Sequence, residues 1–113
     1  MPNLPHVAGA KKKGVVLLRP EEGLEKLNDY LINDTVCIDG PTKQAFNLAR
    51  AIHEKYKVGV KVVNRDNLKE ALPAEVEAIN APIQEIVGEG RAEAVKFKDG
   101  KAVGVCLVLF IEE

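Results

Sequence analysis

The sequence predicts an α/β domain with a β-α-β-α-β core, a further broken helix and a C-terminal β-hairpin, arranged on a mixed sheet of about five strands. Short runs of β-branched and aliphatic residues alternate with segments whose apolar residues recur at helical spacing. The second such run ends in Asp-Gly-Pro and passes directly into a helical pattern. An Asp-Gly pair near the C-terminus lies between two strand-like segments, which is a hairpin signal.

Length and charge limit the classes of protein to which the chain can belong. With 113 residues, 46% hydrophobic and 29% charged, it has the size and composition of one folded domain. We expect residues 1–13 to form a flexible basic arm and residues 14–113 a single α/β domain. The formal net charge of −1 excludes a global positive field that would attract nucleic acid or a membrane. Neither a signal-peptide pattern nor a membrane-length apolar run is present, so the expected location is cytoplasmic.

The first strand and helix are predicted before residue 34. Residues 14–18 are apolar on both faces, as in a strand that is covered on both sides. Pro20 then suits the first turn of a helix, and Gly23 costs that turn up to roughly 1 kcal/mol relative to alanine. The buried stripe of this helix would consist of Leu24, Leu27 and Leu31.

The second strand and helix form the clearest unit in the sequence. Residues 35–39 are a β-branched run, and Pro41 follows with a φ angle that is already helical. Gly40 or Asp39 would cap a helix that continues to Tyr56. Its apolar stripe would consist of Ala45, Leu48, Ala49, Ile52 and Tyr56.

The stretch after the third strand, which is predicted at residues 58–63, is interpreted as helical. Residues 67–87 are expected to form two short helices, because Pro82 interrupts an otherwise helical pattern. The inner face of these helices would carry Val76, Ile79 and Ile83.

The C-terminal segment predicts a hairpin followed by an apolar strand. Residues 93–98 alternate with period two, Asp99-Gly100 is a type I′ turn signal, and the return strand begins at Lys101. Residues 103–111 are almost wholly apolar, which places them in the middle of a sheet or against a partner subunit. Self-association is therefore expected.

The candidate site is the junction between the second strand and its helix. A strand that runs directly into a helix start points free amide N–H groups, and the positive end of the helix dipole, at the carboxyl edge of a sheet. There, the backbone N–H groups of Thr42 and Lys43, the Thr42 hydroxyl and the Lys43 ammonium could hold the phosphate or carboxylate of a phosphorylated small molecule. The anion-binding set is thus Asp39, Gly40, Thr42 and Lys43. The alternative is a structural helix cap, because a cap and a turn need the same residue types. The segment lacks Walker or GxGxxG spacing, so it does not indicate a nucleotide in particular.

Catalytic residues, metal ligands and a cofactor are not predicted, and a non-enzymatic role is favoured. The chain has no serine, and His6 and His53 fall in the arm and on the outer face of a helix. Cys37 and Cys106 lie in apolar runs rather than in a Cys/His cluster. They are interpreted as buried thiols, or as a disulfide if their strands are neighbours.

Two further hypotheses stay open. One is nucleic-acid binding through lysines of the arm and the hairpin, which are Lys11, Lys12, Lys13, Lys96, Lys98 and Lys101. The order strand, helix, strand, helix, strand over residues 14–63, with a later hairpin, resembles in outline the Alba chromatin proteins and the C-terminal domain of bacterial translation initiation factor three. The sequence departs from the Alba pattern in its acidic segment at residues 19–22 and in the insert before the hairpin. The other hypothesis is a structural subunit of a larger assembly.

Overall fold

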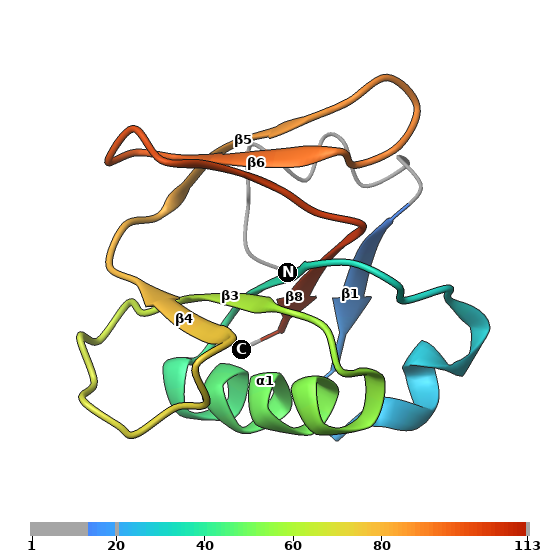
Figure 1. Cartoon of the computed structure of the whole chain (residues 1–113), viewed down its shortest axis with the longest axis horizontal. Coiled ribbons are helices and arrows are strands. Elements are labelled where there is room, and N and C mark those ends of the chain that lie inside the picture. The colour runs from blue at the N-terminus through green and yellow to red at the C-terminus, as the bar shows by residue number, and fades with distance from the viewer. Residues whose placement is uncertain (1–13, 20, 113) are drawn as a thin grey trace.

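The computed structural model describes residues 14–19 and 21–112 (Figure 1). The predicted arm at residues 1–13 lies outside these ranges. The helices are η2 (Leu24–Asp29), a 3-10 helix, and α1 (Thr42–Tyr56). The strands are β1 (Val15–Leu18), β2 (Val36–Asp39), β3 (Val60–Val63), β4 (Val76–Ile79), β5 (Ile83–Val87), β6 (Ala94–Phe97), β7 (Ala102–Gly104) and β8 (Leu107–Ile111). Within the described ranges, no helix is long and apolar enough to cross a bilayer.

The strands form two sheets. A parallel sheet has the order β1-β8-β2-β3-β4, and a separate antiparallel sheet has the order β5-β6-β7. In Figure 1, α1 lies along one face of the parallel sheet, and β5 and β6 lie over the other face. The α/β class and the five-stranded sheet are therefore confirmed, but this sheet is parallel rather than mixed, because the hairpin strands pair with β5 and with each other.

Alternating side chains of the parallel strands bury apolar surface on both faces of the sheet. On the α1 side, Ile38 of β2 belongs to a cluster that contains the fully buried Phe46 of the helix. On the opposite side, Cys37 belongs to a cluster that contains Phe97 of the small sheet. All four residues of β2 are buried. The carboxyl end of β2 is therefore fixed between two layers of core.

The last apolar segment lies at the centre of the parallel sheet. β8 pairs with β1 on one side and with β2 on the other, so that Leu109 is opposite both Val16 and Ile38. All five residues of β8 are buried. The prediction of a mid-sheet strand is confirmed, although the segment begins in β7 of the small sheet and changes sheets before Leu107.

The first predicted helix is shorter and looser than its leucine stripe indicates. Leu27 is fully buried in the α1-side core, as expected, but Leu31 is 81% exposed. Gly23 precedes η2 with a non-helical backbone, at φ −130° and ψ −147°, and Tyr30 follows it in a β conformation. The helix is limited to the 3-10 helix Leu24–Asp29. Gly23 weakens the first turn, and the residues after Asp29 that continue the leucine pattern do not pack on the core.

The two helices predicted for residues 67–87 are wrong. β4 extends the parallel sheet, with Val76 opposite Val60 and Ile79 opposite Val63, and β5 begins the antiparallel sheet. The connection before β4, at residues 64–75, contains no helix. The spacing of Val76 and Ile79 fits a helical face, but pairing with the open edge of β3 satisfies the backbone of this segment instead.

The hairpin at Asp99-Gly100 is confirmed, although its turn is not type I′. Gly100 has a φ of 96°, whereas Asp99 has no positive φ. The Gly100 N–H donates to the Phe97 carbonyl at 3.0 Å, and the Phe97 N–H donates to the Lys101 carbonyl at 2.8 Å. These bonds define a three-residue loop in which a type I turn is followed by a left-handed glycine.

Candidate functional site

The turn between β2 and α1 packs directly against the end of β8. Gly40 has a φ of 154°, and a β-carbon added there would lie 2.6 Å from Cβ of Ile111. Such a separation is shorter than any van der Waals contact between carbons, so only glycine fits without a shift of the backbone. The close approach fixes the point at which the chain enters α1.

The start of α1 has hydrogen-bond donors without a side-chain cap. Pro41 is the N-cap residue and makes no capping bond, and the first intrahelical bond runs from Ala45 N–H to the Pro41 carbonyl at 2.9 Å. Thr42 is 1% exposed, and its hydroxyl has no hydrogen-bond partner among the residues that the structure describes. A buried hydroxyl without a partner costs roughly 1–3 kcal/mol. The first turn of α1 therefore presents the Thr42 hydroxyl and backbone N–H groups that no side chain caps, at the positive end of the helix dipole.

Asp39 and Arg65 join the carboxyl ends of β2 and β3. Asp39 is 4% exposed, and its Oδ1 accepts a hydrogen bond from Arg65 Nε at 2.9 Å. The Arg65 side chain is 38% exposed. The buried carboxylate therefore serves as an anchor for a guanidinium group that still reaches solvent.

A cavity of about 240 Å³ opens beside this ion pair. Its lining consists of Val63, Asn64, Arg65, Asn80, Ala81 and Pro82, which follow or end β3 and β4. The Asn64 side chain accepts from the Leu68 N–H and donates to the Leu68 carbonyl, both at 2.9 Å. These two hydrogen bonds fix the conformation of the turn after β3. Arg65 thus belongs both to the ion pair with Asp39 and to the wall of the cavity.

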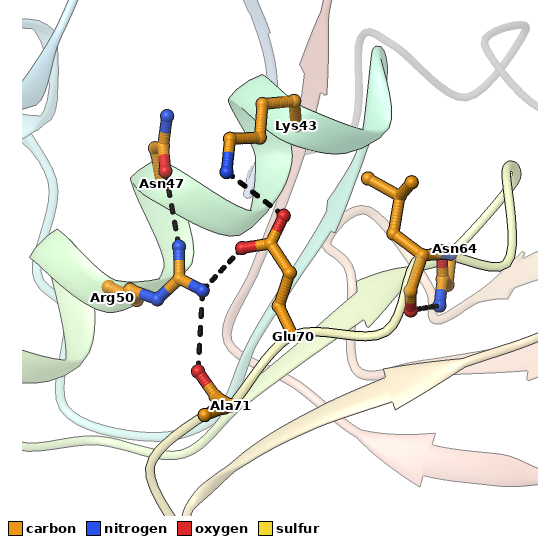
Figure 2. A network of polar contacts seen from close by, with 7 residues as sticks. Lys43, Asn47, Arg50, Asn64, Glu70 and Ala71 are labelled. Atoms are coloured by element: carbon orange, nitrogen blue, oxygen red, sulfur yellow. Dashed lines mark hydrogen bonds and ion pairs between the residues drawn. The ribbon is translucent and has the colours of Figure 1, made fainter.

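Lys43 takes part in a polar network on the outer side of α1 (Figure 2). Its Nζ donates to Oε2 of Glu70 at 3.0 Å, and Nη2 of Arg50 donates to Oε1 of the same carboxylate at 2.6 Å. Hydrogen bonds from Arg50 and Lys43 lower the pKa of Glu70 below its ordinary value. The carboxylate therefore stays ionised and neutralises part of the positive charge near the helix start.

The four residues predicted from the sequence thus lie together at one junction, but they have different roles. Gly40 permits the close packing of the turn, Thr42 contributes a hydroxyl without a partner among the described residues, and Lys43 is bound to Glu70. Asp39 holds a cation rather than an anion. Sequence reasoning missed Arg65, although a basic residue just after the third strand is a signal that could have found it.

The lysines of the nucleic-acid hypothesis do not form one free patch in the described part of the chain. Lys96 and Lys98 are exposed, and Lys96 lies opposite Glu85 on β5. Lys101 donates to Glu77 at 3.2 Å. The remaining members, Lys11, Lys12 and Lys13, lie outside the described residues. Nucleic-acid binding stays a prediction.

The interpretation of the cysteines as free thiols is confirmed, with Cys37 buried as expected and Cys106 less so, whereas His53 differs from its prediction. Cys37 is buried and Cys106 is half-buried, and both thiols are free, so no disulfide joins them. Burial, with a smaller effect of the Asp39 charge, raises the pKa of Cys37. His53, predicted to face solvent, places Nδ1 3.0 Å from the Val58 carbonyl. No group of three or more metal-ligating side chains occurs within residues 14–19 and 21–112.

No protein-family model and no curated protein matches the chain. A ferredoxin-flavin thioredoxin reductase from Clostridium acetobutylicum is similar in structure, with a TM-score of 0.77 and 21% identity over 100% of this chain and 39% of that one. A FAD-dependent pyridine nucleotide-disulphide oxidoreductase from Desulfovibrio vulgaris has a TM-score of 0.67 and 15% identity, over 95% of this chain and 32% of that one.

An atypical thioredoxin reductase from Desulfovibrio vulgaris Hildenborough has a TM-score of 0.57 and 14% identity, over 100% of this chain and 40% of that one. The chain spans two fifths or less of the length of each of these solved structures. At these identities the likeness is one of fold: the chain has the same α/β fold as a segment of each of these structures.

Proposed function

We propose that the chain is a small soluble binding module of the cytoplasm, which holds the phosphate or carboxylate group of a small metabolite at the carboxyl edge of its parallel sheet. The observation that carries the proposal is the Thr42 hydroxyl, which is 1% exposed and has no partner within the described residues. It lies beside amides that no side chain caps. A negatively charged oxygen at this point would satisfy these donors and interact favourably with the dipole of α1.

The positive charge for such a ligand would come from Arg65, which follows β3, and from Lys43 in the first turn of α1. Arg65 lines the cavity of about 240 Å³ and is anchored by Asp39. Lys43 is 66% exposed on its flexible stem, so its ammonium can turn towards a ligand. The lining of the cavity includes neither Thr42 nor Lys43, so a ligand that contacts both Arg65 and Lys43 would extend from the cavity to the helix start.

The residues at the turn favour a single anionic group over the pyrophosphate of a dinucleotide. In a dinucleotide fingerprint, glycines let the pyrophosphate approach the backbone of the turn closely. Here the turn carries the buried carboxylate of Asp39, and Pro41 has no amide N–H to offer.

A non-enzymatic role agrees with the chemistry of the described residues. The Cys37 thiol is buried and its pKa is raised, which disfavours the reactive thiolate. His53 bonds the Val58 carbonyl near the C-terminal end of α1, at the opposite end of the helix from the proposed site. These two groups therefore supply neither a nucleophile nor a base there.

Self-association is part of the proposal, and β1 offers a surface that supports it. This strand lies at the edge of the parallel sheet, and all four of its residues are apolar. The opposite edge strand, β4, carries Glu77 paired with Lys61, a charged arrangement that discourages further pairing. Light scattering after size exclusion should give the mass of a dimer or larger species. A monomer at all concentrations would remove this part of the proposal.

Differential scanning fluorimetry tests the ligand class. Sodium phosphate and AMP should raise the Tm relative to sodium chloride at equal ionic strength, and NAD should raise it less. A ligand at ten times its Kd stabilises a protein by about 1.4 kcal/mol, which corresponds to several degrees in a domain of this size.

Variants then locate the site. Lys43→Met should reduce the shift, whereas Lys55→Met, at the other end of α1, should leave it unchanged when each variant is referred to its own ligand-free Tm. The absence of a shift with any of the three compounds in the unmodified protein would contradict the proposal.

A further inference from the structure

The connection between β3 and β4, here called the strap (residues 64–75), lies against α1. Leu68 and Leu72 of the strap pack on the α1-side core. Asn64 closes its first turn through two hydrogen bonds to Leu68, and Asn67 has a φ of 52°. The strap is therefore attached both by apolar contacts and by a shaped turn at its start.

A single carboxylate ties the middle of the strap to the helix. Glu70 lies between Lys43 and Arg50 in Figure 2, with 3.0 Å from Lys43 Nζ to Oε2 and 2.6 Å from Arg50 Nη2 to Oε1. Arg50 is held in turn by Asn47 at 3.1 Å and by the Ala71 carbonyl at 3.3 Å. The Glu70 side chain is 20% exposed.

The two ion pairs of Glu70 are unequal. Arg50 has three acceptors and a 33% exposed side chain, whereas Lys43 has one acceptor and is 66% exposed. An exposed lysine pair of this kind contributes little to stability and is easily broken. The bond from Lys43 to Glu70 can therefore be exchanged while Arg50 still holds the carboxylate.

We infer that Glu70 is an intramolecular competitor for Lys43, so that a ligand's anionic group displaces the strap carboxylate from this lysine when it binds. The inference rests on the proposed function. A phosphate carries more charge than a carboxylate and meets the N–H groups of the first turn of α1 as well, so it has the advantage over Glu70 for Lys43. Binding removes the contact between Lys43 and the strap while Arg50 keeps Glu70, and the apparent affinity is the intrinsic affinity multiplied by the fraction of protein in which Lys43 is not paired with Glu70.

Isothermal titration calorimetry with inorganic phosphate and with AMP tests this inference on the unmodified protein, Glu70→Gln and Glu75→Gln. The control removes the same charge from the same strap, at a glutamate that lies 3.5 Å from His53 instead. Glu70→Gln should bind about threefold more tightly than the unmodified protein, and Glu75→Gln should bind equally well. Equal or weaker binding by Glu70→Gln, or equal gains in both variants, would overturn the inference while leaving the proposed function standing.

A measurement on the unmodified protein covers the case in which Glu70→Gln does not fold. The pKa of the Glu70 carboxylate, followed by NMR, should rise towards its ordinary value in saturating phosphate because, of the hydrogen bonds from Arg50 and Lys43 that lower it, the one from Lys43 is lost. The pKa of Glu77 should not change. An unchanged pKa of Glu70 in saturating phosphate would also overturn the inference. If neither compound binds the unmodified protein, the proposed function fails together with it, an outcome distinct from the others.

Discussion

Oδ1 of Asp39 accepts a hydrogen bond from Nε of Arg65 at 2.9 Å, and this contact joins the ends of two adjacent parallel strands. The two partners differ in exposure, since Asp39 is 4% exposed and the Arg65 side chain 38%. The charge of the buried carboxylate is therefore stabilised mainly by the arginine, whereas the charge of the guanidinium is also stabilised by solvent.

This asymmetry predicts unequal costs for removing the two partners. Arg65→Met leaves a buried carboxylate without its cation and should lower the free energy of unfolding by roughly 2–3 kcal/mol. Asp39→Asn leaves a partly solvated guanidinium, so its cost should be only about 1 kcal/mol. Urea denaturation of both variants measures the difference, and an equal or larger cost for Asp39→Asn would contradict it.

Gly40 should be the least replaceable glycine of the site. Gly40→Ala places a methyl group 2.6 Å from Cβ of Ile111 and should destabilise the fold by about 2 kcal/mol or more. Gly100→Ala is the matched control, because Gly100 also has a positive φ but no atom within 4 Å of an added β-carbon. Its cost should be about 1 kcal/mol, from the backbone alone. Similar midpoints of denaturation for the two variants would exclude the proposed packing against Ile111.

Glu77 should make the stability depend on pH in the acid range. Hydrogen bonds from Lys61 and then Lys101 lower its folded-state pKa below the ordinary 4.5. A depressed pKa contributes stability that is present above the unfolded-state pKa and is lost as the pH falls through the folded-state pKa. Because the side chain is 45% exposed, the contribution should be below about 1 kcal/mol.

Thermal unfolding of the unmodified protein and of Glu77→Gln, recorded from pH 7 to pH 3, measures this contribution. The two melting temperatures should differ at neutral pH and converge below pH 4.5. A difference that stays constant or grows on acidification would show that Glu77 does not have the lowered pKa.

The two thiols should react at very different rates. Cys37 is fully buried in a strand covered on both faces, and burial raises its pKa, whereas Cys106 is half-buried. A disulfide reagent at pH 8 should therefore modify one thiol in the native protein and both after unfolding. Cys106→Ala should abolish the reaction of the native state. Rapid modification of both thiols in the native protein would contradict the burial of Cys37.

Much of the α/β framework can be predicted from local signals. The run that contains Cys37 and the helix that starts after Pro41 are specified by β-branched residues, a proline at the helix start and a clear apolar stripe. The segment around Val76 cannot be assigned in this way, because apolar residues three positions apart fit a helix and a short buried strand equally well. This segment forms a strand because it pairs with the edge of β3, a contact between separate parts of the chain that the local sequence pattern does not encode.

The candidate site could be placed but not completed from the sequence. The junction at Thr42 follows from the strand-to-helix pattern, since this pattern fixes where free amides point. The roles of Arg65 and Glu70 depend on how residues 64–75 fold across α1 and beside β2. A connection without regular structure carries no periodicity, so its contacts could not be read from the chain.

The hydroxyl of Thr42 offers the most direct test of anion binding at the start of α1. Thr42→Val keeps the shape of the side chain and removes a buried hydroxyl that has no partner in the part of the chain that the structure describes, so it should leave the fold unchanged or more stable. If the hydroxyl donates to the ligand, inorganic phosphate measured by titration calorimetry should bind the variant at least about tenfold more weakly, as expected for a lost hydrogen bond to a charged group. Equal phosphate affinities in the unmodified protein and Thr42→Val would contradict the account.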